Sequence, residues 1–180
     1  MNARWCALAV LGGLLTPLSA LDWHDAGREP IQVGGGIATW EPAARKASAA
    51  VGAAFTAGVL LPVEAAFGPP GIDFDWRSNQ GAQGAIDHAS LMATLRHTLD
   101  RTGVYVGAGA GLGYGGYRSG ESDLVTTSGL GPCAKGVVGY GSGPLFVEAA
   151  YLFPRPLGDL RLDGFALMVG FRFGSGWYRP

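Results

Sequence analysis

The stretch from Gly103 to Gly120 reads GVYVGAGAGLGYGGYRSG, and it is the part of the chain that decides the fold. Glycine occupies positions 107, 109, 111, 113 and 115, and each residue between them from Val106 to Tyr114 is apolar. This period of two residues predicts a β-strand with two very different faces. Glycine weakens a strand and has no side chain to pack. A phosphate loop, the inside of a soluble barrel or the inside of a membrane barrel could explain a face made of glycine.

The N-terminal segment predicts secretion. MNARWCALAVLGGLLTPLSA carries Arg4 near its start, an apolar core from Ala7 to Leu15, and small residues before Leu21. This is the layout of a cleaved signal peptide, and the apolar core is short for a spanning helix. We therefore expect a signal peptide at 1–20, a periplasmic lead-in at 21–30, a barrel at 31–174 and a short tail at 175–180.

The composition argues against several classes of protein. Charged residues make up 15% of the chain, against about 25% in ordinary soluble domains. The net charge is −1 and no basic patch stands out, so we expect no nucleic-acid partner. Once the signal peptide is removed Cys133 is the single cysteine, which leaves no disulfide framework. We expect no cofactor and no metal site.

Eight segments have the alternation of a strand, although the Ala-rich second one also fits a helix. They are Ile31 to Trp40, Ala50 to Leu60, Val63 to Gly68, Ser90 to Leu99, the opening stretch, Cys133 to Tyr140, Leu145 to Phe153 and Phe165 to Phe173. The connections alternate in length: Leu61-Pro62 is very short and Pro69 to Ala89 is long. Long connections on one side and short ones on the other are typical of an up-and-down outer-membrane barrel.

Each of the clearest strands has one continuous apolar face and one face of small and mixed residues. A soluble lipocalin-like barrel would point the apolar face inward and coat the other with polar side chains. Here the second face is mostly glycine and alanine, which suits the narrow lumen of eight strands. We therefore expect these residues to face lipid: Val104, Val106, Leu112, Leu145, Val147, Phe165, Leu167, Val169, Phe171 and Phe173.

Five charged residues share the glycine face by parity, namely Glu64, Arg96, Lys135, Glu148 and Arg172. Buried charges are tolerated when they are paired and hydrogen-bonded. We therefore expect a charge network that plugs the lumen. Glu148 and Arg172 lie on consecutive antiparallel strands, and we expect them to be diagonal neighbours.

Three other motifs have simpler interpretations than a functional site. GLGYGG at 111–116 matches a dinucleotide motif, but a loop follows it instead of a helix. His88 and Ser90 share a strand face, so the histidine could activate the serine in a lipid ester hydrolase. No carboxylate is placed to orient His88, and an inert pair is the simpler interpretation. In the long 69–89 loop, aspartates 73, 75 and 87 match no calcium motif, while Phe74 and Trp76 are candidates for partner or headgroup contact.

VYVGAGAGLGY, FVEAAYLF and LMVGFRF together resemble segments of the small eight-stranded outer-membrane β-barrels, the opacity-protein-like and porin-like barrels of Gram-negative bacteria. The last segment is similar to the C-terminal signal read by the barrel-assembly machinery, although the chain continues past Phe173. The resemblance implies an all-β, eight-stranded antiparallel transmembrane barrel in the outer membrane. It implies a non-enzymatic role, structural or in surface interaction, with outer-membrane lipids and the assembly machinery as partners and an extracellular ligand at the loops. The alternatives are a lipid A type ester hydrolase using His88 and Ser90, and a secreted soluble ligand-binding barrel.

Overall fold

The computed structural model describes residues 31–61, 65, 67–99, 103–120, 125–142 and 144–173. The expected signal peptide, lead-in and tail lie outside these residues. The described chain forms eight strands and one short helix. In order they are β1 (Ile31–Trp40), α2 (Pro42–Ala47), β2 (Gly52–Leu60), β3 (Pro70–Gly81), β4 (Gly84–Leu99), β5 (Val104–Ser119), β6 (Val125–Ser142), β7 (Leu145–Pro154) and β8 (Gly164–Phe173).

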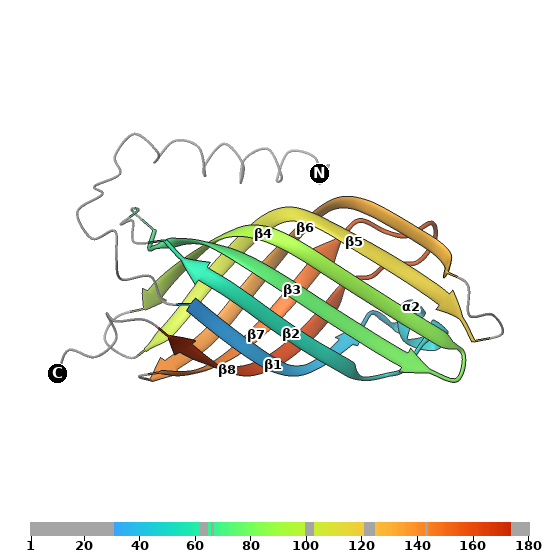
Figure 1. The fold of residues 1–180 in the computed structure, drawn as a ribbon, viewed down its shortest axis with the longest axis horizontal. Helices are drawn as coiled ribbons and strands as arrows, with labels where there is room; N and C mark the ends of the chain where they lie inside the picture. Colours follow the sequence, from blue (N-terminus) through green and yellow to red (C-terminus); the bar gives the residue numbers. More distant parts are fainter. Residues whose placement is uncertain are drawn as a thin grey trace.

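The eight strands close into one barrel in which each strand pairs with its neighbours in the sequence (Figure 1). All pairings are antiparallel, and β1 closes the barrel by pairing with β8, with Gly34 opposite Gly170. The predicted all-β, eight-stranded up-and-down barrel is therefore confirmed. In the described part of the chain, no helix is long and apolar enough to cross a membrane.

The glycine face of β5 points into the barrel, where the neighbouring strand comes close. A Cβ added at Gly111 would overlap the Leu91 carbonyl oxygen and lie 2.7 Å from the Met92 Cα atom. Leu112, the next residue along β5, is 58% exposed on the outer face. Glycine is therefore required at position 111 by a close backbone approach, and the alternation of β5 separates the inside of the barrel from the outside.

The third strand was predicted at the wrong place. Val63 to Gly68 falls in the connection before β3, and the predicted loop from Pro69 to Ala89 contains β3 and the first part of β4. In the segment IDFDWR from Ile72 to Arg77, apolar and charged residues alternate with a period of two, as in a strand. Its charges sit on the inner face, where the charges of other strands compensate them, so they do not break the strand.

The expected alternation of connection lengths is only partly right. At the end of the barrel that carries α2, β3 and β4 are joined by a two-residue turn, 82–83, whereas β7 and β8 are joined by 155–163. At the opposite end β2 and β3 are joined by 61–69, where a two-residue turn was expected. The prediction failed here because the third strand had been placed too early.

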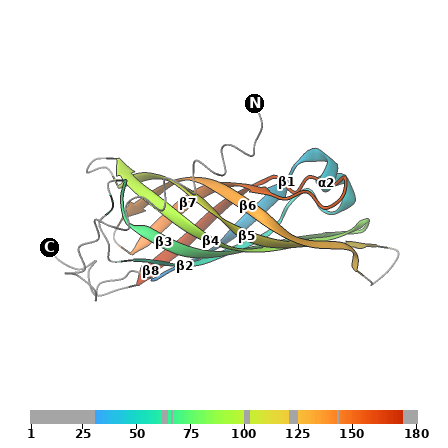
Figure 2. The same cartoon turned by 90° about the horizontal axis from the view of Figure 1, so that it is seen from above.

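The rim of the barrel is uneven at the α2 end. β4, β5 and β6 span 16, 16 and 18 residues, whereas β1, β7 and β8 span 10 each. The longer strands therefore extend past the others, and Figure 2 shows α2 across the mouth from this extension. A buried cluster closes the mouth, made of Trp40, Ala44, Ile86, Leu157 and Leu162.

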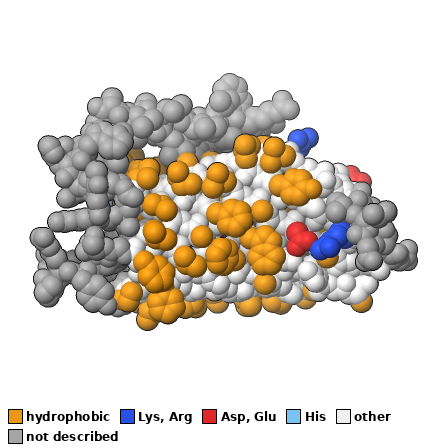
Figure 3. All heavy atoms as spheres, in the orientation of Figure 1, with side chains coloured by type: hydrophobic (Ala, Val, Ile, Leu, Met, Phe, Trp, Pro, Cys, Tyr) orange, Lys and Arg blue, Asp and Glu red, His pale blue; other side chains and the backbone are white. Residues whose placement is uncertain are grey.

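Large hydrophobic side chains cover the outside of the barrel. Leu91, Leu112, Val169 and Phe171 are each more than half exposed. Figure 3 shows hydrophobic side chains spread over the middle of the visible face, with the charged side chains in its right-hand part. Asp87 and Arg118, 3.0 Å apart, form a partly exposed ion pair on the extended part of β4 and β5. The apolar side of this barrel therefore points outward.

Candidate functional site: a charged network inside the barrel

The interior of the barrel holds charged side chains in place of an apolar core. Every second residue of β3 points inward, which buries Asp73, Asp75 and Arg77 with at most 3% of each residue exposed. Three more charged residues are at most 4% exposed: Arg96 on β4, Lys135 on β6 and Glu148 on β7. The strict alternation of the strands places these groups in one lumen.

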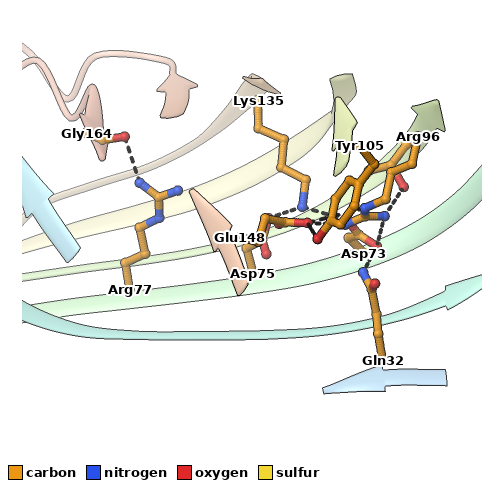
Figure 4. A network of polar contacts seen from close by, with 10 residues as sticks. Gln32, Asp73, Asp75, Arg77, Arg96, Tyr105, Lys135, Glu148 and Gly164 are labelled. Atoms are coloured by element: carbon orange, nitrogen blue, oxygen red, sulfur yellow. Dashed lines mark hydrogen bonds and ion pairs between the residues drawn. The ribbon is translucent and has the colours of Figure 1, made fainter. Parts of the chain in front are cut away.

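Asp73 forms ion pairs with two cations, Arg96 and Lys135. Its Oδ2 atom lies 2.7 Å from the Arg96 Nη2 atom and 2.6 Å from the Lys135 Nζ atom. Lys135 Nζ also lies 2.8 Å from Asp75 Oδ2. β3 and β4 are neighbours, but β6 is three strands away from β3. The Lys135 contacts therefore cross the lumen (Figure 4).

Glu148 adds a fourth strand, β7, to the network. Its Oε2 atom lies 3.3 Å from Arg96 Nη2 and accepts a hydrogen bond of 3.0 Å from the Tyr105 hydroxyl. Arg96 thus lies between two carboxylates, Asp73 and Glu148, as Figure 4 shows. Gln32 on β1 donates from Nε2 to Asp73 Oδ1 at 3.2 Å. Partners on four other strands, β1, β4, β5 and β6, therefore share the buried charge of the three carboxylates.

Two further arginines lie on either side of this network along the barrel axis, Arg77 toward the α2 end and Arg172 toward the opposite end. Arg77 donates from Nη1 to the Gly164 carbonyl at 2.9 Å, and its Cζ lies 6.0 Å from the centre of the Trp40 ring. Toward the other end, the Arg172 Cζ lies 4.9 Å from the Tyr105 ring centre and 5.3 Å from that of Phe146. Both guanidinium groups lie over aromatic faces, an arrangement that stabilises a cation.

The residues proposed for the lumen are placed as follows. Arg96, Lys135, Glu148 and Arg172 are all buried on the inner face. Asp73 joins Arg96 to Lys135, and Glu148 contacts Arg96 directly. Glu64 lies outside the described residues. The expected diagonal contact between Glu148 and Arg172 is wrong in register.

That register follows from the pairing of the last two strands. Glu148 lies opposite Met168. The Arg172 amide donates to the carbonyl of Pro144, so Arg172 lies four residues away from the position opposite Glu148. The ion partner of Glu148 is Arg96, which lies across the lumen. The sequence defines the face of each residue, but only the register fixes its height along the barrel.

Sequence reasoning missed Asp73, Asp75 and Arg77, as well as the neutral partners Gln32 and Tyr105. A signal for the first three was present, because IDFDWR alternates as a strand does. Gln32 and Tyr105 share the inward parity of their strands, but nothing in the sequence singles them out. Phe74 and Trp76, expected on a loop, are 41% and 37% exposed on the outer face of β3.

The residues expected to face lipid lie on the outer face. Val104 is half-buried. The others are exposed by between 36% and 58%: Val106, Leu112, Leu145, Val147, Phe165, Leu167, Val169, Phe171 and Phe173.

His88 and Ser90 are both inside the barrel, at 2% and 3% exposure. Among the described residues, neither His88 Nδ1 nor Ser90 Oγ has a hydrogen-bond partner. The nucleophile and base of a hydrolase are normally hydrogen-bonded to each other, and the base to a third group. This pair lacks that arrangement. The described residues also contain no group of three histidine, cysteine or acidic side chains able to hold a metal ion.

Comparison with solved structures finds the same architecture in three bacterial proteins. Neisserial surface protein A superposes with a TM-score of 0.56 at 17% identity, over 81% of this chain and 96% of that one. Ail, the attachment invasion locus protein of Yersinia pestis, solved with the heparin analogue sucrose octasulfate, gives 0.53 at 14%, over 82% and 99%. The N-terminal β-barrel domain of Pseudomonas aeruginosa OprF gives 0.50 at 15%, over 82% and 99%.

No protein-family model matches the sequence, and no curated protein matches it. The likeness is therefore one of structure. All three neighbours are small eight-stranded outer-membrane β-barrels. With its eight strands closed in the same way, this chain has the fold of the small eight-stranded outer-membrane β-barrels.

Proposed function

We propose that this protein is a non-enzymatic, integral outer-membrane β-barrel whose lumen is closed by charged side chains and whose external segments serve a structural or surface-interaction role. In this proposal α2 and the extended ends of β4, β5 and β6 face the outside of the cell. The partners are outer-membrane lipids, the barrel-assembly machinery during biogenesis, and an extracellular ligand at the external segments.

One observation carries the proposal: the polarity of the barrel is inverted relative to a soluble protein. The outer face exposes large side chains such as Leu112, Val169 and Phe171, while Asp73 and Glu148 are fully buried. A soluble protein rarely exposes so continuous an apolar surface, whereas a membrane barrel requires one. This inversion argues against the soluble ligand-binding barrel.

The ionic network supports the closed lumen. Arg96, Lys135 and the three carboxylates they contact occupy the cross-section between β3 and β7. Eight strands leave room inside only for side chains. We therefore expect negligible conductance in planar bilayers.

The hydrolase alternative has less support. Ser90 is 3% exposed and faces the lumen, so an acyl ester in the bilayer does not reach its hydroxyl. His88 is not hydrogen-bonded to it. Two of the neighbours are named for the cell surface and for attachment, which supports a surface role rather than catalysis in this proposal.

The experiment that tests the proposal combines three measurements on the full chain. Washed outer membranes should retain the protein, and it should migrate differently before and after boiling, as closed barrels do. Purified protein in planar bilayers should give no steady open channel. Release into the soluble fraction would refute the membrane assignment, and ester hydrolysis that is lost in Ser90→Ala would establish the enzyme instead.

A further inference from the structure

Strand β6 continues past the end of its neighbour β7. The pairing of the two strands begins at Ser142 opposite Leu145 and ends at Cys133 opposite Pro154. β6 itself begins at Val125 and stays paired with β5 over that length. One edge of β6 therefore has no partner strand from Val125 to Pro132 within the described chain.

The chain itself prevents β7 from covering this edge. β7 ends in the sequence Pro154-Arg155-Pro156, and neither proline has an amide hydrogen to donate. A single bond continues the ladder, from the Arg155 amide to the Pro132 carbonyl at 3.1 Å. The chain then turns away through Leu157, whose amide donates to the Leu160 carbonyl.

The direction of that bond shows which groups of β6 face the open edge. In a strand the amide and carbonyl of one residue point to the same side, and successive residues alternate. Because the Pro132 carbonyl points toward β7, the backbone groups of Leu130 and Ser128 point the same way. Gly129 and Gly131 direct theirs toward β5. The open edge thus presents two amides and two carbonyls, spaced as a partner strand requires.

A cavity of about 260 Å³ adjoins this edge. Its walls are Gly113 and Gly115 on β5, Gly129 on β6, and the turn from Pro154 to Gly158. The glycines leave this space open because they have no side chains. A Cβ at Gly129, for example, would lie 3.3 Å from a methyl group of Leu157 and narrow the cavity. Ser128 and Leu130 line the same cavity, so the open edge forms one of its sides.

One arginine and one histidine give the cavity its chemistry. His88 lies at its inner end, 2% exposed, with Nδ1 lacking a hydrogen-bond partner among the described residues. Arg155 lines one side of the cavity. The methylene groups of its side chain pack beside Gly131, where a Cβ would overlap them, and the residue as a whole is exposed. Among the residues that the structure describes, no acidic side chain lines the cavity. A carboxylate in the cavity would therefore meet an arginine and an imidazole.

We propose that the open edge of β6 binds an extended peptide segment of a partner protein, which adds as a strand beside Ser128 and Leu130 and places one acidic side chain in the cavity. Successive side chains of a strand point to opposite faces. One side chain of the added segment would therefore enter the cavity while its neighbours stay outside. Main-chain hydrogen bonds supply affinity in this mode, and the pocket supplies specificity.

The proposal rests on the proposed function, because it needs the α2 end to face outside the cell. The binding site itself is tested independently of that orientation, on full-length protein folded in detergent micelles. The probe is a fluorescein-labelled peptide of about seven residues, the length of an ordinary strand, with alternating threonine and valine and a central glutamate. A peptide with central glutamine is the matched control, and fluorescence anisotropy measures the Kd of each.

Three variants and one control variant separate the two parts of the site, the strand edge and the cavity. Ser128→Pro removes one edge amide and should weaken both peptides by about tenfold, whereas Ser128→Ala should not. Proline already occupies position 132 on the same edge, so the barrel should tolerate it; altered mobility of unboiled protein would reveal misfolding. Gly129→Val fills the cavity and should abolish binding of the glutamate peptide. This variant keeps the test decisive if Ser128→Pro does not fold. Arg155→Gln should weaken the glutamate peptide by about tenfold and the glutamine peptide by less than about twofold.

Three results would overturn the proposal. The first is the absence of peptide binding to the wild type, and the second is glutamate-peptide binding that survives both Ser128→Pro and Gly129→Val. The third is free N-acetylglutamate binding as tightly as the peptide, which would make the cavity a small-molecule site without strand addition. None of these results bears on membrane location, which fractionation tests separately.

Discussion

Lys135 Nζ lies 2.6 Å from Asp73 Oδ2, although the two residues belong to strands β6 and β3, which are not neighbours in the sheet. A barrel is normally held by hydrogen bonds between adjacent strands. Here an ion pair crosses the lumen and joins opposite walls. Both side chains are almost fully buried, at 1% and 0% exposure, so water screens the interaction little.

We expect Asp73→Ala to destabilise the barrel strongly. The change removes an anion that contacts the buried cations Lys135 and Arg96. Breaking such a buried ion pair costs about 3–5 kcal/mol of unfolding free energy. Asp87→Ala is the matched control, since its pair with Arg118 is 36–43% exposed and should contribute about 1 kcal/mol or less. Urea unfolding of both variants in lipid vesicles measures the difference. Equal effects would contradict the buried network.

The pair formed by Glu148 and Arg96 predicts a non-additive result. Glu148→Ala removes an anion that contacts Arg96 and Tyr105, and it should cost about 3–5 kcal/mol in unfolding free energy. The double variant Glu148→Met, Arg96→Met should cost less than the sum of the two single changes, because it leaves no lone member of the pair. A double-mutant cycle in vesicles gives this coupling, and simple additivity would show that the pair is not coupled.

Charge on the outer face should act through the bilayer. Val169 is 55% exposed near the middle of β8, so Val169→Arg should cost about 2–4 kcal/mol in vesicles. Ala166, on the opposite face, is fully buried, and Ala166→Arg should fail by overpacking the lumen. Folding yield in vesicles and in water distinguishes the two variants. A Val169→Arg protein that folds normally and becomes soluble would rule out the membrane barrel.

Glycines on the inner and outer faces of the barrel should respond differently to an added methyl group. Gly111→Ala puts a methyl group against the Leu91 carbonyl and should cost about 1–3 kcal/mol by overpacking. Gly136→Ala is the control, because a Cβ there meets no atom within 4 Å, and its effect should be within about 0.5 kcal/mol. Thermal unfolding in micelles measures both. Equal tolerance at 111 and 136 would mean that the barrel relaxes around position 111.

The strand class, the number of strands and the sorting of residues into inner and outer faces could be predicted from the sequence alone. The physical reason is that the period of two is a local property of extended backbone. Once Val106 and Leu112 are outside, Gly107 and Gly111 must be inside. The same parity placed Arg96, Lys135, Glu148 and Arg172 together on one face before any contact was known.

The tertiary structure alone decided which of these charges meet. Parity says nothing about height along the barrel, which depends on the register of each strand pair and on where each strand begins. Arg172 was therefore matched with Glu148, when the partner of Glu148 is Arg96 on β4. Asp73 was assigned to a loop because the third strand was predicted too early, and the cations of β4 and β6 that compensate its buried charge are distant in sequence. A residue's face is fixed by its own strand, whereas its partner is fixed only when the barrel closes.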